Sequence, residues 1–331
     1  MRPGVKFHSG KDFTSADVVY TFKRLLDEKT GSGARAVLAF LDPEGIKAPD
    51  PMTVTFTTQK PVVQLPVLIT NKFTNIVPDG AKAEDLKLKG DGTGPFMQEQ
   101  FTPNAPVRIL RKNPNYWDAG KPMAKCLKIT VAQEAVAAVA ALKAGQVDLM
   151  LNVDPSVIAT VKDDPNVQML QTGASNSMTV SMWVDTAPFD NPKVREALKL
   201  VVNRQAMVDT VLLGFGQPGA DNPVPVASPA SYVKEAPKQD INKAKALLAE
   251  AGYKAGLKFD LYTAEGVPGM VRMAQVFAEM AKPAGFDINV IVTPAESYWD
   301  DVWLKKPIVT SAWSMRPPGE GLAVAYTQNA K

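Results

Sequence analysis

The 331-residue chain is poor in the side chains that most often bind metals or catalyse reactions, with one cysteine and one histidine. A single cysteine, Cys126, excludes a disulfide within the chain and a metal cage built from several thiolates. A single histidine, His8, gives a Ser-His-Asp triad one possible base and leaves a histidine-rich metal site without ligands. We expect Cys126 to be a small buried hydrophobic residue and His8 to make structural hydrogen bonds. No catalytic residue, metal site or cofactor is predicted.

Long apolar runs and basic blocks are also missing. No run of about 18 apolar residues occurs, so no membrane-spanning helix is encoded. The first residues, MRPGVKFHSGKDF, contain no apolar segment, so we expect no signal peptide within this chain. The net charge is +3, and no dense Lys/Arg patch interleaved with aromatics is present. Nucleic-acid binding is therefore not expected.

The common catalytic motifs G-x-S-x-G, the P-loop and H-E-x-x-H do not occur. The stretch GFGQPG, Gly214–Gly219, matches the dinucleotide pattern by letter, but a helix enters it where a strand is required. We expect these glycines to end a helix and turn a loop. Two acid pairs, at 163–164 and 300–301, are sequence neighbours that do not face each other on a helix. An enzyme is not expected, although a site assembled from distant residues stays open.

Hydrophobic periodicity predicts most of the regular structure. "TSAD", Thr14–Asp17, fits a capping box ahead of a helical apolar stripe, and Gly145 stands where a helix C-terminal glycine belongs. The expected helices are 15–27, 133–145, 190–212, 240–252 and 268–285, and the expected strands are 52–59, 107–112, 127–132, 146–153, 257–264 and 286–292. In the second half, helices and strands alternate, which predicts an α/β fold with parallel strand pairing.

Several aromatic and charged residues in unusual places are candidate ligand contacts. Trp183 lies in the strand-like run VSMWVDTAPF, and SAWSMRPPGEG contains Trp313 and Arg316. The prolines stop a strand there, which puts Arg316 at a strand end, where α/β proteins bind ligands. A tryptophan in a strand is more often part of the core, and an arginine is often in a structural ion pair.

The turn-rich loop KNPNYWDAGKPM contains adjacent aromatics, Tyr116 and Trp117. They could form a ligand platform, a partner surface, or a pin that fastens the loop to a core. We expect the pin, with both rings packed in a small hydrophobic cluster.

Seven stretches occur in an order that resembles a known family. They are GVKFHSGKDFTSADVVYTFKRL, APDPMTVTFTTQKP, GDGTGPF, VRILRKNPNYWDAGKP, ALKAGQVDLM, APFDNPKVREALKLVVNRQAMV and INKAKALLAEAGY. Together they resemble the extracytoplasmic solute-binding proteins of peptide-type ABC importers, solute-binding family 5. The resemblance runs from Gly4 to about Trp313.

The resemblance implies a bilobal α/β fold of the periplasmic-binding-protein class II type with an extra domain. Residues 1–92 would lie in the extra domain, 93–178 in the first lobe, and 179–331 in the second lobe. Compared with the family pattern, the chain lacks strands before Gly4 and a continuation beyond Lys331. We therefore expect a fragment with both ends missing and with truncated lobes.

The function that the resemblance implies is capture of a solute between two lobes and its delivery to a membrane permease, without a cofactor. A monomer in the periplasm, or a cell-surface lipoprotein, is expected. The solute class stays open among a peptide, an opine-like compound, a sugar and a metal chelate. A hydrolase or transferase that uses the same cleft is the alternative, and a chaperone-like or signalling receptor is a third possibility.

Two departures from the family pattern bear on specificity. Many peptide binders have an aspartate shortly after the tryptophan of the last element, whereas this chain reads WSMRPPG. Arg316 supplies the opposite charge and would bind a carboxylate in a bidentate fork. Trp183 stands where family members often have asparagine, which favours an apolar or ring-bearing group. Trp183, Trp313 and Arg316 are therefore the predicted ligand-binding residues.

Overall fold

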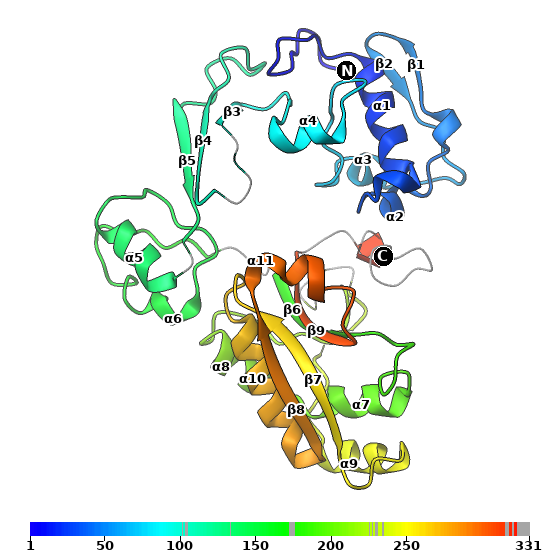
Figure 1. The fold of residues 1–331 in the computed structure, drawn as a ribbon, viewed down its shortest axis with the longest axis vertical. Coiled ribbons are helices and arrows are strands. Elements are labelled where there is room, and N and C mark those ends of the chain that lie inside the picture. The colour runs from blue at the N-terminus through cyan, green and yellow to red at the C-terminus, as the bar shows by residue number, and fades with distance from the viewer. Residues whose placement is uncertain are drawn as a thin grey trace. The chain divides into compact units, whose positions relative to one another are not determined.

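The computed structural model describes residues 1–100, 102, 105–132, 134–171, 176–224, 226, 228, 231–233, 235–314, 318–319 and 321–322. The chain divides into two compact units, one of Met1–Ala132 together with Leu322 and one of Gln133–Gly321 (Figure 1). Each unit has its own sheets and its own buried clusters.

The first unit contains short helices and two small antiparallel sheets. Its elements are α1 (Ser15–Leu26), η1 (Glu28–Thr30), α2 (Arg35–Leu38), η2 (Pro43–Gly45), β1 (Lys47–Asp50), β2 (Thr53–Thr55), α3 (Leu65–Leu68), α4 (Ala83–Leu88), β3 (Phe96–Gln100), β4 (Val107–Lys112) and β5 (Cys126–Thr130). β1 pairs with β2, and β3, β4 and β5 form a three-stranded meander.

Helix α1 begins at the predicted capping box, formed by Thr14 and Asp17. The Asp17 carboxylate is fully buried and accepts hydrogen bonds from the Thr14 N–H, the Asp79 N–H and the Lys11 ammonium. Burial raises the pKa of Asp17, but these hydrogen bonds outweigh it, so the pKa lies below its ordinary value. The apolar stripe of α1, which includes Phe22, packs into the main buried cluster of this unit. The prediction for this helix is confirmed.

The second unit is built on one mixed sheet. Its elements are α5 (Ala135–Lys143), α6 (Pro155–Ile158), β6 (Asn176–Met182), α7 (Pro192–Leu200), α8 (Arg204–Val211), α9 (Ile241–Glu250), β7 (Leu257–Ala264), α10 (Met270–Ala281), η3 (Lys282–Ala284), β8 (Phe286–Thr293), α11 (Ala295–Ser297), the π-helical turn η4 (Tyr298–Val302) and β9 (Ile308–Ser314).

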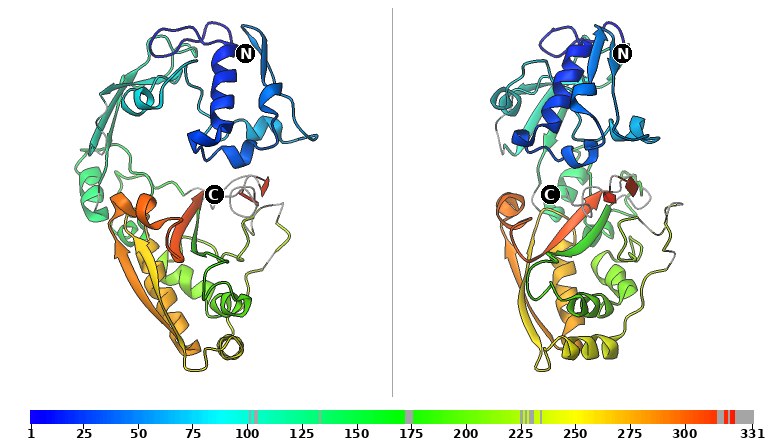
Figure 2. Two further views of the ribbon diagram at one scale, coloured as in Figure 1. Left: turned by 45° about the vertical axis from the view of Figure 1, so that its right-hand side comes forward. Right: turned by 90° about the vertical axis from the view of Figure 1, so that its right-hand side faces the viewer.

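The strand order in this sheet is β6-β9-β7-β8. β7 runs parallel to β8 and to β9, as predicted, whereas β6 runs antiparallel to β9. α10 lies along β7 and β8, and α9 lies at the opposite end of the unit from α11 (Figures 1 and 2). The largest buried cluster joins side chains of α7, α9 and α10 to one face of the sheet.

An ion pair links the small buried cluster around α5 and α6 to α10. Asp154 caps α6 by accepting from the Ser156 N–H at 2.8 Å, and its Oδ1 lies 3.5 Å from an Arg272 guanidinium nitrogen on α10. Burial raises the pKa of Asp154, but the hydrogen bonds to Ser156 and the charge of Arg272 lower it more. The net shift is downward, so the carboxylate remains ionised at neutral pH.

Three local predictions were wrong in detail. The helix expected over 190–212 is two helices, because the Asn203 side chain caps α8 by accepting from the Ala206 N–H. The strand expected over 146–153 does not form. Leu149 and Leu151 are 71% and 73% exposed, so this apolar stretch has no sheet to cover it. Cys126 is exposed at the start of β5, not buried.

Tyr116 and Trp117, the two aromatic residues of the loop KNPNYWDAGKPM, do not form a buried pin. Trp117 is 42% exposed, and the Arg2 guanidinium carbon lies 3.4 Å from its ring centroid. Tyr116 packs against Trp117 at 5.1 Å between centroids, and neither ring belongs to a buried cluster of the described residues. A cation–π contact therefore replaces the expected hydrophobic cluster. His8 does have the predicted structural role, with its ring nitrogen 3.0 Å from the Gly94 carbonyl oxygen.

The three-domain division at 1–92, 93–178 and 179–331 stays a prediction. β6 pairs with β9 along its whole length, from Asn176 to Met182. Across the residues that the structure describes, no helix has both the length and the apolar character needed to cross a bilayer.

Candidate functional site

The sheet of the second unit has two chemically different faces. Side chains alternate along a strand, so Ile308 of β9 and its alternate neighbours point to the face buried under α7, α9 and α10. Val309, Ser311 and Trp313 point to the other face. β6 contributes Thr179 and Ser181 to that second face, which is therefore lined by hydroxyls and an indole.

Three hydroxyls on this face form a closed hydrogen-bonded cluster. The Ser311 oxygen lies 2.8 Å from the Thr179 oxygen and 3.0 Å from the Ser181 oxygen, and the last two are 3.1 Å apart. The Trp313 indole N–H donates to Ser311 at 3.0 Å. Ser311 is 1% exposed, so this network is held in the body of the protein. It fixes the orientation of the Trp313 ring.

A row of aromatic rings leads from Trp313 to η4. The Trp313 and Trp303 centroids are 5.8 Å apart, those of Trp303 and Trp299 are 5.9 Å apart, and those of Trp299 and Tyr298 are 5.1 Å apart. All three pairs are edge-to-face, the arrangement that ring quadrupoles favour. We call Trp299, Trp303 and Trp313 the tryptophan array. It contains three of the five tryptophans of the chain.

Tyr298 anchors the array in the core. Its ring is 1% exposed, and its hydroxyl donates to the Thr310 carbonyl oxygen of β9. Burial raises the pKa of Tyr298, and the hydrogen bond to Thr310 offsets part of the rise. The hydroxyl therefore stays protonated at neutral pH and remains a donor. Nearby, the Lys306 ammonium lies 5.0 Å from the Tyr262 ring centroid.

The structure places the three predicted ligand residues differently. Trp313 is part of the array. Trp183 is 39% exposed and directly follows the last residue of β6, and its backbone N–H donates to the Pro307 carbonyl oxygen. Trp313 pairs with Ser177, so the two tryptophans lie about 20 Å apart along the ladder at roughly 3.3 Å per residue. The structure does not bring them together. Arg316 lies outside the described residues.

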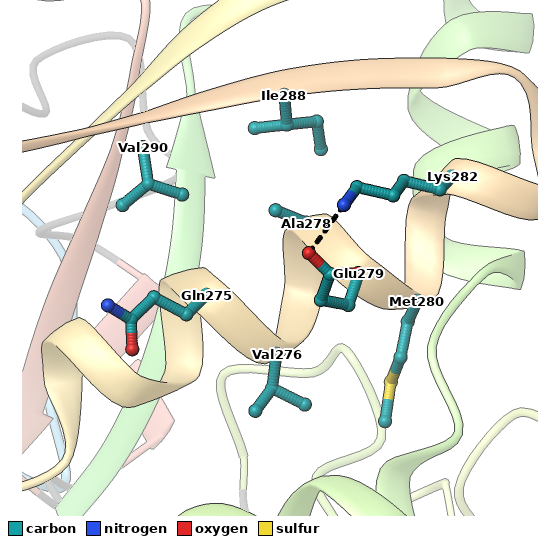
Figure 3. A pocket seen from close by; sticks show the side chains of 8 residues that line it. All are labelled: Gln275, Val276, Ala278, Glu279, Met280, Lys282, Ile288 and Val290. Carbon is teal, nitrogen blue, oxygen red and sulfur yellow. Dashed lines mark hydrogen bonds and ion pairs between the residues drawn. The ribbon is translucent and has the colours of Figure 1, made fainter.

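A shallow groove of about 690 Å³ lies elsewhere on this unit, between α10 and β8 (Figure 3). Its lining is mostly apolar, with Val276, Met280, Ile288 and Val290, and a Glu279–Lys282 ion pair of 2.6 Å crosses it. β8 is an edge strand, and β7 separates it from β9, the strand that carries Trp313. The groove is therefore not part of the tryptophan array.

Among the described residues, no three His, Cys, Asp or Glu side chains lie close enough together to hold a metal ion. The second sheet face instead combines aromatic rings with hydroxyls. These groups can hold a solute by stacking and hydrogen bonding.

Sequence reasoning missed Trp299, Trp303 and Ser311. A usable signal was present, since three tryptophans fall between positions 299 and 313 of a chain that has five. Composition alone could not show that their rings touch, because that depends on η4 and on the register of β9.

Comparison with known proteins identifies the family. The family model described as bacterial extracellular solute-binding proteins, family 5 Middle, matches residues 1–330. Heme-binding protein A of Haemophilus influenzae is 31% identical over 331 residues, covering 91% of this chain and 59% of that protein. Di/tripeptide-binding protein 1 of Pseudomonas aeruginosa is 28% identical over 342 residues, covering 95% of this chain and 60% of that protein. These relatives are binding proteins by name.

Solved structures agree on the fold. The periplasmic binding protein DppA of Helicobacter pylori, in complex with the peptide STSA, superposes with a TM-score of 0.87 at 23% identity, covering 98% of this chain and 67% of that one. The PBP AgaA from A. tumefacien R10, in complex with agropinic acid, gives 0.82 at 25% identity, covering 93% and 63%. The predicted bilobal periplasmic-binding-protein-like α/β fold is confirmed.

The chain spans about three fifths of the length of the curated relatives it matches. Within that span, the family model covers it almost from end to end. The chain therefore belongs to family 5 of the bacterial extracellular solute-binding proteins.

Proposed function

We propose that the chain is the solute-binding part of an ABC importer, which captures a peptide or a similar small solute outside the cytoplasm and delivers it to a membrane permease. The observation that carries the proposal is the family match over residues 1–330. The names of the relatives favour a peptide among the solutes considered, since one binds di- and tripeptides and a solved structure holds a peptide. One relative is named for heme binding and a solved structure holds agropinic acid, so the proposal includes small solutes other than peptides.

The chemistry of this function is binding alone. A ligand shifts a protein between conformations only through its differential affinity for them, and a micromolar site corresponds to about −8.2 kcal/mol. Main-chain hydrogen bonds to an extended peptide would supply part of this free energy and would tolerate many side chains. No covalent step is needed, and the hydrolase or transferase alternative has no observation in its favour.

The roles of individual residues are part of the proposal. Trp313 contacts the solute from the second face of the sheet, with Ser311 fixing its ring. Trp183 belongs to the far end of the β6–β9 ladder, so it contacts the same solute only if that solute is about 20 Å long. Arg316 is proposed to bind a carboxylate of the solute.

Calorimetric titration of the chain with di- and tripeptides tests the proposal. We expect saturable binding of at least one peptide in the micromolar range. The Trp313→Ala variant should bind about tenfold more weakly, because it loses one stacked ring and the apolar area that this ring buries. Ala312→Gly, a neighbour on the opposite face, is the control and should bind as the parent chain does. Equal affinity of the parent and Trp313→Ala would contradict the placement of the site.

A further inference from the structure

The tryptophan array is partly exposed at the surface. Trp299 is 47% exposed, and Trp303 and Trp313 are half-buried. Single exposed aromatics are ordinary on protein surfaces, whereas gathered ones mark places of interaction. The array lies next to the hydroxyl cluster of the same sheet face.

The backbone that carries the array is unusual at two points. The Trp303 N–H donates to the Tyr298 carbonyl at 2.9 Å, an i to i−5 bond that makes this turn π-helical. Such turns are rare and are frequent at functional sites. The next residue, Leu304, has a left-handed backbone with φ of 61°, a strained conformation for a branched aliphatic residue. Both irregularities set the position of Trp303, which links Trp299 to Trp313.

The array is also held in place before any ligand arrives. Tyr298, adjacent to Trp299, is buried and bonded to the β9 backbone. Trp313 is bonded to Ser311, which in turn contacts two further hydroxyls. The indole N–H of Trp313 thus donates within the protein. Rings that are already ordered lose little conformational entropy on binding.

The angles within the array favour a flat partner. Trp299 and Trp303 meet at 68°, and Trp303 and Trp313 meet at 69°. Each such pair forms a corner, in which an added ring can stack on one indole while its edge meets the other, and both arrangements are favourable for aromatic pairs. We propose that the tryptophan array binds a flat aromatic group of the captured solute. This inference rests on the proposed function and names a substrate class within it.

The test compares ligands that differ in one side chain. Gly-Gly, Gly-Leu and Gly-Phe share the same charged ends and differ in having no side chain, an apolar one, or an aromatic one. We expect Gly-Phe to bind the intact chain about tenfold more tightly than Gly-Leu, the sum of two aromatic pair contributions. N-acetyl-phenylalanine amide and N-acetyl-leucine amide form a second pair without charged ends, for use if dipeptides do not bind.

Matched variants locate the effect. Trp299→Leu and Trp303→Leu should each reduce the preference for the aromatic ligand to about twofold or less. Trp299 is the safer variant, because its side chain is half exposed and its loss leaves the core intact. Trp117→Leu removes a tryptophan of similar exposure, 42% against 47%, from the other unit and should leave the preference unchanged.

Each outcome decides a separate point. Equal binding of Gly-Phe and Gly-Leu would overturn the aromatic inference and leave the proposed function standing. Tight binding of Gly-Gly would do the same, because it would indicate that the array holds the ammonium end of the peptide. If none of the three dipeptides binds, the titration with further di- and tripeptides decides the proposed function, and the amide pair decides the aromatic inference. A selective heat of binding for the phenylalanine amide that Trp299→Leu removes supports the array as an aromatic site, and its absence overturns it.

Discussion

Replacing Tyr298 with alanine is expected to lower the free energy of unfolding by about 3–5 kcal/mol, the range for deleting a large aromatic side chain from a core. Tyr298 is 1% exposed and packs with Met270, Val302 and Val309 in the cluster beneath the array. The deletion opens a cavity and also leaves the Thr310 carbonyl without its donor. Urea denaturation followed by circular dichroism would measure the change from the shift of the midpoint at constant slope.

Tyr298→Phe separates packing from hydrogen bonding. It keeps the ring and removes the donor to Thr310, so the expected loss is about 1–2 kcal/mol, the cost of a buried acceptor left without a partner. Val292→Ala, at an edge-strand residue that is 51% exposed, is the control and should change stability by less than about 1 kcal/mol. A loss below about 1 kcal/mol for Tyr298→Ala would mean that Tyr298 does not anchor the array.

Replacing Asp17 with asparagine is expected to destabilise the first unit by about 2–3 kcal/mol at neutral pH. Breaking a fully buried ion pair costs about 3–5 kcal/mol, but Lys11 is 43% exposed and water screens part of the interaction. In the variant, the amide NH₂ replaces one oxygen and meets a donor, either the Thr14 N–H or the Asp79 N–H. The same urea titration reports the loss.

The effect of Asp17→Asn should depend on pH in one direction. The folded-state pKa of Asp17 lies below its ordinary value of 3.8. Its carboxylate therefore stabilises the folded chain above about pH 4, and this stabilisation is lost as pH falls through the folded-state pKa. The difference between the parent and the variant should shrink toward pH 3.

A matched control separates this buried carboxylate from surface charge. Asp12→Asn removes an exposed partner of Lys6, with 74% of the Asp12 side chain exposed, and should change stability by less than about 1 kcal/mol at any pH. A difference between the parent and Asp17→Asn that stays constant between pH 7 and pH 3 would contradict the ionic role of Asp17.

Helix starts were predictable from sequence where a capping residue precedes a clear apolar stripe. Thr14 and Asp17 form the predicted capping box of α1. Asn191 caps α7 and Asp240 caps α9, close to the predicted helix starts at residues 190 and 240. These signals are local, because a side-chain oxygen bonds the N–H groups of its own first turn. The strands β7 and β8 were predictable because LKFDLYTA and FDINVIV begin with alternating apolar and polar residues. Their parallel pairing was predictable because a helix lies between them in the sequence.

Predictions failed where burial depends on distant partners. The stretch 146–153 has the composition of a strand, but no neighbouring strand pairs with it, so its leucines are exposed. Cys126 has the character of a core residue but lies on a strand of the exposed three-stranded sheet. A scale of residue hydrophobicity or strand propensity does not show whether another surface is present to cover the residue.

The candidate site was predictable in part. Trp313 was predicted because it lies just before prolines that end a strand. Its neighbours Trp299 and Trp303 were not predicted, because their contact with Trp313 depends on η4 and on the connection from η4 to β9. A π-helical turn has no reliable sequence signature, so the contact could not be read from spacing. Trp183 was chosen because family members often have asparagine at its position, and the antiparallel register of β6 puts it at the other end of the ladder from Trp313.

The central claim is that the chain holds a solute and makes or breaks no bond in it. The most direct test is mass spectrometry of a bound peptide, recovered after long incubation with the chain and denaturation of the complex. We predict a single species with the mass of the added peptide, retained in proportion to the chain. Fragments or modified peptide that accumulate with time, and that heat-denatured chain does not produce, would contradict the account and favour an enzyme.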